Sequence, residues 1–165
     1  QQMGDKIAIL FHFNKHVFGY AKGLEGLGIP VEVPKARAGS DYFQVDFNSD
    51  KPKILTFHAA KGLTFDTIIM PQLTKRWFQR LDEDQIERLL FVGITRATKW
   101  VYMSATESSQ LPSLQKLYPL EKEGSLTIQR PDVSVTGQPG LPGFLPQIDA
   151  DYEEGDDVDD VTGIL

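Results

Sequence analysis

The chain has 165 residues, of which 41% are hydrophobic, and it carries a net charge of −6 at pH 7. This length predicts one domain with a substantial core, and the lack of cysteine excludes a disulfide framework or a thiolate metal site and suits the cytoplasm, where we expect the protein. No apolar run approaches the length of a membrane span, no signal peptide opens the chain, and its start at Gln rather than Met suggests a piece of a longer protein.

The charge is unevenly distributed. Residues 131–165 hold nine acidic and no basic side chains, so residues 1–130 carry a net charge of +3. A mildly basic body is compatible with phosphate binding at a local patch. Pro and Gly crowd residues 137–146 and eight acids follow from Asp149 to Asp160, which predicts a domain at 1–130 and a disordered acidic tail at 131–165. The tail would be free to meet a protein partner.

The first half of the domain predicts strands alternating with a helix. Lys6–Phe11 is an apolar run typical of a buried strand. Asn14 is a plausible N-cap for a helix through about Leu27, and Ile29–Val33 is the next short strand. Short links between these elements favour a parallel unit of an α/β fold. A further strand is expected at 42–47 within a polar stretch.

Two more strands are predicted at Lys53–Phe57 and Thr67–Met70, separated by a small polar turn. The turn leaves Thr56, His58 and Lys61 at a strand edge, where a ligand could sit.

A helix is predicted from an N-cap at Asp82, with a stripe of apolar residues that continues to Ala97. Arg88 and Thr95 then share the opposite face, with Arg96 turned part-way from it. A strand at Trp100–Ser104 follows, then a short helix near 111–117 and a strand at 125–129.

The segment Lys75–Arg80 mixes three cations with two aromatic residues and is expected to be a loop. It could bind a nucleic-acid strand or a partner, because bases stack on aromatic rings and cations meet phosphate. We favour the alternative, in which Trp77 and Phe78 cover the core and the cations are solvated.

Two long patterns resemble those of a known family. Thr56-Phe-His-Ala-Ala-Lys-Gly-Leu-Thr-Phe-Asp66 looks like motif V, and Glu87-Arg-Leu-Leu-Phe-Val-Gly-Ile-Thr-Arg-Ala97 looks like motif VI, of the UvrD/Rep-like superfamily 1 DNA helicases. Ala8–Asn14 looks like motif IV, and the resemblance covers about residues 6–105. It implies the C-terminal, second RecA-like domain: a three-layer α/β fold of the P-loop NTPase type with a mainly parallel sheet. Only 41 residues separate motifs IV and V, so the subdomain that larger members insert there is absent or vestigial.

The resemblance also implies roles for individual residues. Arg96 matches the arginine finger of motif VI, which stabilises charge on the γ-phosphate during phosphoryl transfer. The other matches are Gly62, Thr64, Arg88 and His12 for the nucleotide, and Thr56, His58, Lys61 and Thr95 for the backbone of single-stranded DNA. Two positions depart from the family, which usually has Arg where this chain has His12 and an acidic residue where it has Thr64.

The sequence contains no G-x-x-x-x-G-K-[ST] loop and no acidic pair after a strand to bind magnesium. ATP and Mg²⁺ are therefore expected to bind mainly to an N-terminal RecA-like domain of the same protein, and this chain alone is not expected to hydrolyse ATP. The predicted function is the C-terminal motor domain of an ATP-dependent DNA helicase or translocase, of a family associated with DNA repair. The alternative is a non-catalytic, helicase-derived module that binds nucleic acid or protein. A metabolic α/β enzyme would need a cleft chemistry that the sequence does not offer.

Overall fold

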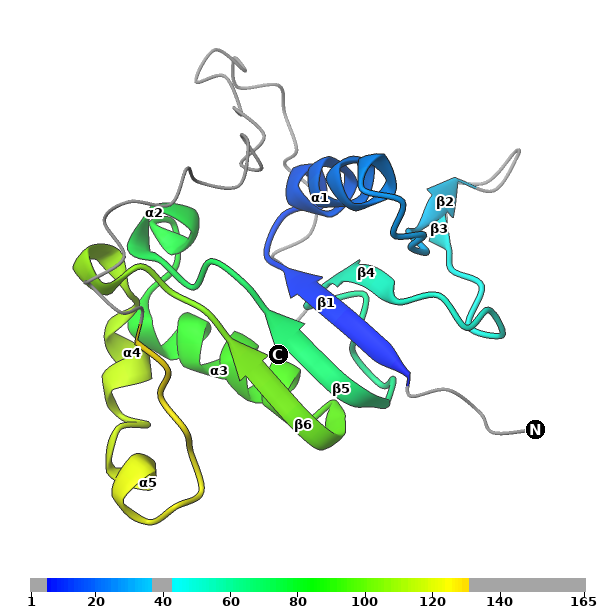
Figure 1. The fold of residues 1–165 in the computed structure, drawn as a ribbon. Coiled ribbons are helices and arrows are strands. Elements are labelled where there is room, and N and C mark those ends of the chain that lie inside the picture. Colours follow the sequence, from blue (N-terminus) through cyan, green and yellow to red (C-terminus); the bar gives the residue numbers. More distant parts are fainter. Residues whose placement is uncertain (1–5, 37–42, 131–165) are drawn as a thin grey trace, which may run out of the picture.

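A four-stranded sheet in the order β4-β1-β5-β6 forms the centre of the chain (Figure 1). The structure is a computed structural model that describes residues 6–36 and 43–130. Its strands are β1 (Ile7–Phe11), β4 (Lys53–Thr56), β5 (Phe65–Met70) and β6 (Ala97–Met103), and all neighbouring strands are parallel. The predicted α/β fold with a mainly parallel sheet is therefore confirmed.

Alternate residues of β1 enter two separate cores, one on each face of the sheet. Ala8 and Leu10 belong to the larger core, whereas Ile9 and Phe11 pack in the smaller one. Helix α1 (Asn14–Gly26) covers the smaller core above β1 and β4. The larger core lies under α2 (Lys75–Phe78), α3 (Glu83–Ile94) and α4 (Pro112–Gln115). Helices on both faces of a parallel sheet give three layers.

Several boundaries differ from the sequence prediction. Asn14 is already helical, so Phe13 and not Asn14 occupies the N-cap of α1. The Phe13 side chain has no acceptor oxygen and makes no capping hydrogen bond. The strand expected at Ile29–Val33 is reduced to one bridge, between Glu32 and Lys53. The strand expected at 42–47 is β3 (Phe43–Gln44), which pairs antiparallel with β2 (Lys35–Ala36) in a separate two-stranded sheet.

Helix α3 begins as the sequence predicted. The carboxylate of Asp82 accepts a hydrogen bond from the Gln85 backbone N–H at 2.8 Å, and the Gln85 side chain accepts one from the Asp82 N–H at 3.0 Å. This capping box satisfies two N–H groups that the first turn leaves without helical partners. The helix ends at Ile94 with Thr95 as its C-cap, earlier than the apolar stripe suggested, so Arg96 lies just outside it.

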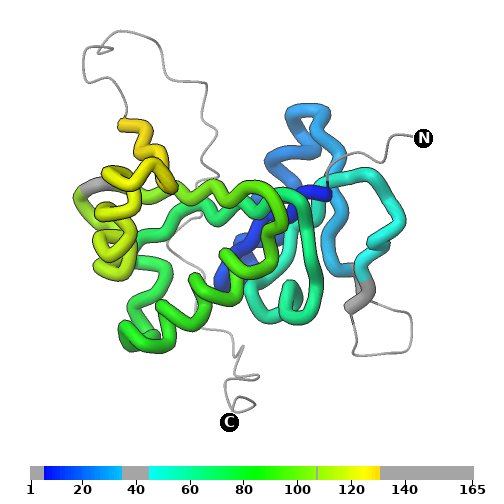
Figure 2. The backbone as a smooth tube through the Cα atoms, turned by 90° about the horizontal axis from the view of Figure 1, so that it is seen from below, coloured from blue at the N-terminus to red at the C-terminus, as the bar shows by residue number. Residues whose placement is uncertain are grey.

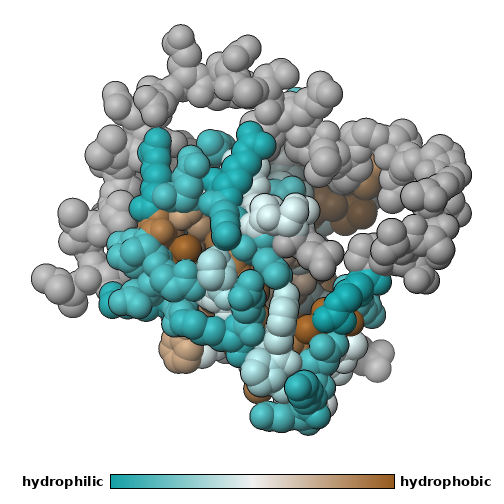
Figure 3. All heavy atoms as spheres, turned by 90° about the vertical axis from the view of Figure 1, so that its left-hand side faces the viewer, coloured by the Kyte–Doolittle hydropathy of each residue, from teal (hydrophilic) through white to brown (hydrophobic). Residues whose placement is uncertain are grey.

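The segment Lys75–Arg80 begins with the short helix α2 rather than forming a loop. Phe78 is buried, Trp77 packs against the core, and Lys75 and Arg76 are exposed, which confirms the favoured alternative. Figure 3 shows this side of the molecule, where hydrophilic residues cover most of the described surface.

Past β6 the chain forms a 3₁₀ turn (Glu107–Ser109), α4 within the predicted helix, and α5 (Pro119–Lys122), which was not predicted. Residues 125–129 form no strand, contrary to expectation. The predicted acidic tail lies outside the described residues. Within the described ranges, no helix is both long and apolar enough to cross a bilayer.

Candidate functional site

The parallel sheet divides the candidate residues between its two ends. Thr56 ends β4 and His12 follows β1, so both lie at the carboxyl ends of the strands. Phe65 and Ala97 begin β5 and β6 at the amino ends. Residues 57–64 connect the two ends, and they pass by way of the larger core, into which Phe57 and Ala60 are buried. Figure 2 shows the same path from below.

Arg96 lies at the amino ends, where it ties the end of α3 to the connection before β5. Its guanidinium donates from Nη1 to the Leu63 carbonyl at 3.3 Å and from Nη2 to Thr95 Oγ1 at 3.2 Å, while Nε donates to the Val92 carbonyl at 3.3 Å. The Arg96 carbonyl accepts from the Phe65 N–H at 2.8 Å. The three side-chain bonds are at the long end of the normal range for N–H donors, so they hold the guanidinium loosely.

Thr95 uses its hydroxyl within its own helix. Oγ1 lies 2.8 Å from the Phe91 carbonyl and 3.2 Å from the Val92 carbonyl, and it accepts from Arg96. A DNA phosphate would have to compete with these partners. Arg88, two turns earlier on α3, is exposed and lies apart from Arg96 along the helix.

Gly62 and Thr64 occupy the connection near Arg96. Gly62 has φ of +81°, a backbone conformation that residues other than glycine rarely adopt. Apart from its chain neighbours, no described residue lies within 4 Å of where its Cβ would be. The backbone turn, not a crowded neighbour, therefore requires this glycine. Thr64 is exposed and lines a hollow of about 310 Å³. Lys61, in the same connection, is exposed.

Thr56 and His58 lie at the other end of the connection. Thr56 Oγ1 accepts from the Ala59 N–H at 3.1 Å, which fixes the first turn after β4, and His58 is exposed beside it. The hydroxyl and imidazole therefore stand on a structured turn at the carboxyl end of the sheet.

His12 does not join the other predicted nucleotide residues. It lies at the carboxyl end and stacks on Phe78 with ring centroids 5.2 Å apart, and its buried Nδ1 has no hydrogen-bond partner among the described residues. Burial, together with nearby His58, lowers the pKa of His12 to about 4. The imidazole is then neutral at pH 7 and cannot replace the charge of the arginine that the family has here.

His16 shares this aromatic environment. Its ring meets Trp77 edge-on with centroids 4.3 Å apart, and within residues 6–36 and 43–130 its buried Nε2 has no hydrogen-bond partner. Burial is the main cause that lowers the pKa of His16 to about 4, with Lys15 and His12 adding to the effect.

These two histidines predict a loss of stability in mild acid. Between pH 6.5 and about 4 the unfolded chain binds protons that the folded chain does not, so the free energy of unfolding falls as the pH drops through this window. Above pH 6.5 both states are neutral, and below about 4 the loss is complete. His16→Phe keeps the aromatic contacts and removes one titrating group, so its melting temperature should fall less steeply than that of the wild type. Equal slopes in thermal melts at several pH values would contradict this prediction.

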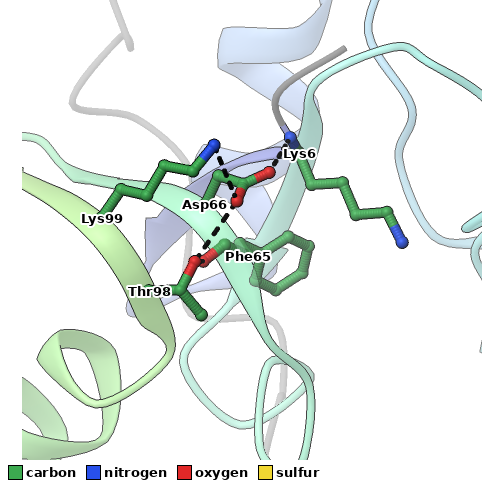
Figure 4. A network of polar contacts seen from close by, with 5 residues as sticks. All are labelled: Lys6, Phe65, Asp66, Thr98 and Lys99. Carbon is green, nitrogen blue, oxygen red and sulfur yellow. Dashed lines mark hydrogen bonds and ion pairs between the residues drawn. The ribbon is translucent and has the colours of Figure 1, made fainter. Parts of the chain in front are cut away.

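Asp66 closes the amino ends of three strands (Figure 4). Its Oδ2 accepts from the Lys6 backbone N–H at 2.9 Å, and its Oδ1 lies 3.3 Å from both the Thr98 hydroxyl and the Lys99 ammonium. The Lys6 hydrogen bond is the largest cause that lowers the pKa of Asp66, followed by the contacts of Lys99 and Thr98. Asp66, the last residue of the motif V pattern, therefore holds together the amino ends of these strands near Arg96. The sequence did not predict this role.

Comparison with known proteins locates the similarity in this same part of the chain. Residues 38–108 match the family model of the UvrD-like helicase C-terminal domain. DNA helicase II of Rickettsia typhi is 40% identical over 35% of this chain and 10% of its own length, and the ATP-dependent DNA helicase srs2 of Schizosaccharomyces pombe is 37% identical over 39% and 8%. A probable DNA helicase of Mycoplasma pneumoniae is 29% identical over 60% of this chain and 17% of its own length.

Among solved structures, the C-terminal domain of a possible DNA helicase from Lactobacillus plantarum aligns with a TM-score of 0.48 and 19% identity, over 67% of this chain and 61% of that one. The chain matches about a tenth of the length of the first curated relatives.

Proposed function

We infer that the chain, whose residues 38–108 belong to the UvrD-like helicase C-terminal domain family, is the C-terminal motor domain of an ATP-dependent DNA helicase or translocase. It would supply the arginine finger and contacts to the single strand. The family match supports a helicase domain, and the whole protein's activity is our proposal.

One observation carries the proposal: a single connection, residues 57–64, joins the two candidate sites. At one end of this connection the Leu63 carbonyl accepts a hydrogen bond from the Arg96 guanidinium. At the other end the exposed His58 side chain lies next to Thr56. A motor protein must couple the state of its bound nucleotide to its affinity for DNA. A short segment that contacts both sites, packed into the core between them, is suited to that task.

The chemistry follows from the residues. When ATP binds between this domain and an N-terminal RecA-like partner domain, Arg96 would leave its long bonds to Leu63, Val92 and Thr95 and donate to the γ-phosphate. Its charge would stabilise the transition state of phosphoryl transfer. Mg²⁺ would be held mainly by the partner domain, since no group of three His, Asp or Glu within the described residues could bind a metal ion.

DNA contacts are proposed at the carboxyl ends of the strands. The Thr56 hydroxyl, the His58 imidazole and the Lys61 ammonium can meet phosphates without reading base sequence, which suits a protein that moves along DNA. Thr95 would join them only if its hydroxyl exchanged the Phe91 carbonyl for a phosphate.

A direct test is the binding of fluorescent oligo-dT to the chain, measured by anisotropy. Deleting residues 131–165 removes nine acidic side chains from a body of net charge +3. The truncated chain should bind DNA more tightly at low salt and keep its melting temperature nearly unchanged. Lys61→Ala in the truncated chain should weaken the binding and its salt dependence, whereas Lys22→Ala, an exposed control on α1, should not. Unfolding of the truncated chain, or equal effects of the two lysines, would refute this arrangement.

A further inference from the structure

The segments that follow three strands of the sheet form a basic surface. Residues 12–16, 57–61 and 71–80 come after β1, β4 and β5, and Figure 1 shows α2 and the start of α1 at the end of the sheet to which the arrows point. The three segments carry five basic side chains and no acidic one. All five are exposed: Lys15, Lys61, Lys75, Arg76 and Arg80. Such a surface attracts a partner of negative charge.

Aromatic contacts join α1 and α2 across this surface. The Lys15 ammonium lies 5.5 Å from the centroid of the Phe13 ring. The Arg76 guanidinium lies 5.0 Å from the centroid of the Trp77 ring. His16 connects the two pairs, because its ring centroid lies 5.8 Å from that of Phe13 and 4.3 Å from that of Trp77. Lys15 and Arg76 are therefore near each other, separated only by a short row of aromatic side chains.

The turn after β4 adjoins the same surface. The His12 ring lies 4.2 Å from the Phe13 ring, measured between centroids. His58 is close enough to His12 to add to the burial that lowers the pKa of His12. Lys61 follows His58 by three residues, so its charge belongs to the same end of the molecule as Lys15.

The chain itself contains a polyanion that can reach this surface. Residues 149–160 hold eight acidic side chains and no basic one, and they lie outside the described ranges. Arg130, where the described chain ends, is 19 residues before Asp149. A chain of that length spans up to about 60 Å when extended. A domain of about 130 residues has a radius of gyration of about 14 Å, so every face of it is within reach.

We propose that residues 149–160 dock on this basic surface and compete there with single-stranded DNA. Both ligands present a row of negative charges, and the ammonium and guanidinium groups of Lys15, Lys61 and Arg76 bind carboxylates as well as phosphates. Because the segment is tethered, its local concentration is on the order of mM, and a weak contact is enough to hold it. The competition rests on the proposed function, which places DNA at this end of the sheet, whereas the docking does not.

Two tryptophans provide a reporter and its control. Trp77 lies on the basic surface, and Trp100 lies on β6, where it is 63% exposed. The test compares the full chain with a variant in which the eight acids of residues 149–160 are changed from Asp to Asn and from Glu to Gln. In the Trp100→Phe background, these changes should increase the quenching of Trp77 by acrylamide, which is uncharged. In the Trp77→Phe background, they should not alter the quenching of Trp100.

The charges on the surface can be tested in the same way. With Lys15→Gln and Arg76→Gln together, neutralising the acidic segment should no longer change the quenching of Trp77. Lys6→Gln with Lys51→Gln is the matched control, because it removes two exposed lysines from around the hollow beside Thr64, at the amino ends of the strands. This control should keep the full effect of neutralisation. About 0.5 M NaCl should abolish the effect in every variant, because salt screens exposed charges.

Binding of oligo-dT tests the competition. Neutralising the acidic segment should lower the apparent Kd at low salt by about fourfold, as expected when the docked segment leaves the surface free about a quarter of the time. A synthetic peptide of residues 149–160, added to the neutralised chain, should protect Trp77 to a saturating level and displace oligo-dT. A peptide with the same eight acids replaced by amides should do neither.

The outcomes separate the inference from the proposed function. If neutralisation tightens DNA binding but leaves the quenching of Trp77 unchanged, the segment acts only through its overall charge, and the inference is overturned while the proposed function stands. Equal effects in the surface variant and in its matched control also overturn it. If the peptide protects Trp77 without displacing oligo-dT, the docking stands and the proposed position of DNA at this end of the sheet is wrong.

Discussion

Arg96→Ala in the longer protein should lower kcat by about 10³–10⁵, the loss typical of an arginine finger, while nucleotide affinity falls far less. The reason is that the guanidinium meets charge that develops in the transition state. Within the described part of the chain, the guanidinium donates hydrogen bonds of 3.2–3.3 Å to Leu63, Val92 and Thr95. Steady-state kinetics with single-stranded DNA, alongside direct nucleotide binding, measure the two effects separately.

Two further variants sharpen this result. Arg96→Lys should rescue little, because a single ammonium does not reproduce the planar fork of donors. Arg88→Ala is the comparison within motif VI: it removes an exposed arginine, which the resemblance assigns to nucleotide binding, from the same helix at a position away from the Leu63 carbonyl. The neutral His12 side chain cannot supply the positive charge of the arginine that the family has at its position. His12 therefore cannot compensate for the loss of Arg96.

A contrary outcome has a definite meaning. If Arg96→Ala keeps more than about a tenth of wild-type turnover, against the losses typical of fingers, Arg96 is a structural link between α3 and β5. A large loss in Arg88→Ala instead would move the finger to Arg88. A melting curve for each variant shows whether the hydrogen bond to Leu63 also supports the fold.

The order of strands and helices could be predicted because it depends on local patterns. Apolar runs such as Lys6–Phe11 and the capping residues at Asp82 act over a few positions, and both appear where the sequence placed them. The expected strands at Ile29–Val33 and 125–129 depend on a distant partner strand that no local pattern reveals. Similarly, Lys75–Phe78 became a helix because Phe78 could reach the core, which only the tertiary structure decides.

The sequence nominates residues for the candidate site but does not show their arrangement. The motifs identify Thr64 and Arg96, yet they do not say that His12 lies at the opposite end of the sheet from both. The hollow beside Thr64 is also lined by Phe47 and Lys51, which come from a stretch without a motif that the sequence did not single out.

Gly93 is the point where the motif VI helix packs directly on motif V. A Cβ at this position would lie 2.5 Å from Met70 Sδ and 2.9 Å from Phe57 Cε1, both side chains being fully buried. No such approach is seen at Gly19 in α1, where, outside the helix's own backbone, no atom of the described residues lies within 4 Å of the added Cβ. The same substitution at these two helical glycines therefore separates helix propensity from packing.

Gly93→Ala should destabilise the chain, whereas Gly19→Ala should stabilise it. Alanine is favoured over glycine in a helix by about 0.5–1 kcal/mol, which is the whole effect expected at Gly19. At Gly93 that gain opposes an overpacking cost of about 1–3 kcal/mol, so a net loss of up to about 2.5 kcal/mol remains, or several degrees in melting temperature. Met70→Val shortens one obstructing side chain and should make the double variant less destabilised than the sum of the single variants. If Gly93→Ala raises the melting temperature as Gly19→Ala does, α3 has room to move away from Phe57, and the packing between motifs V and VI is looser than these distances require.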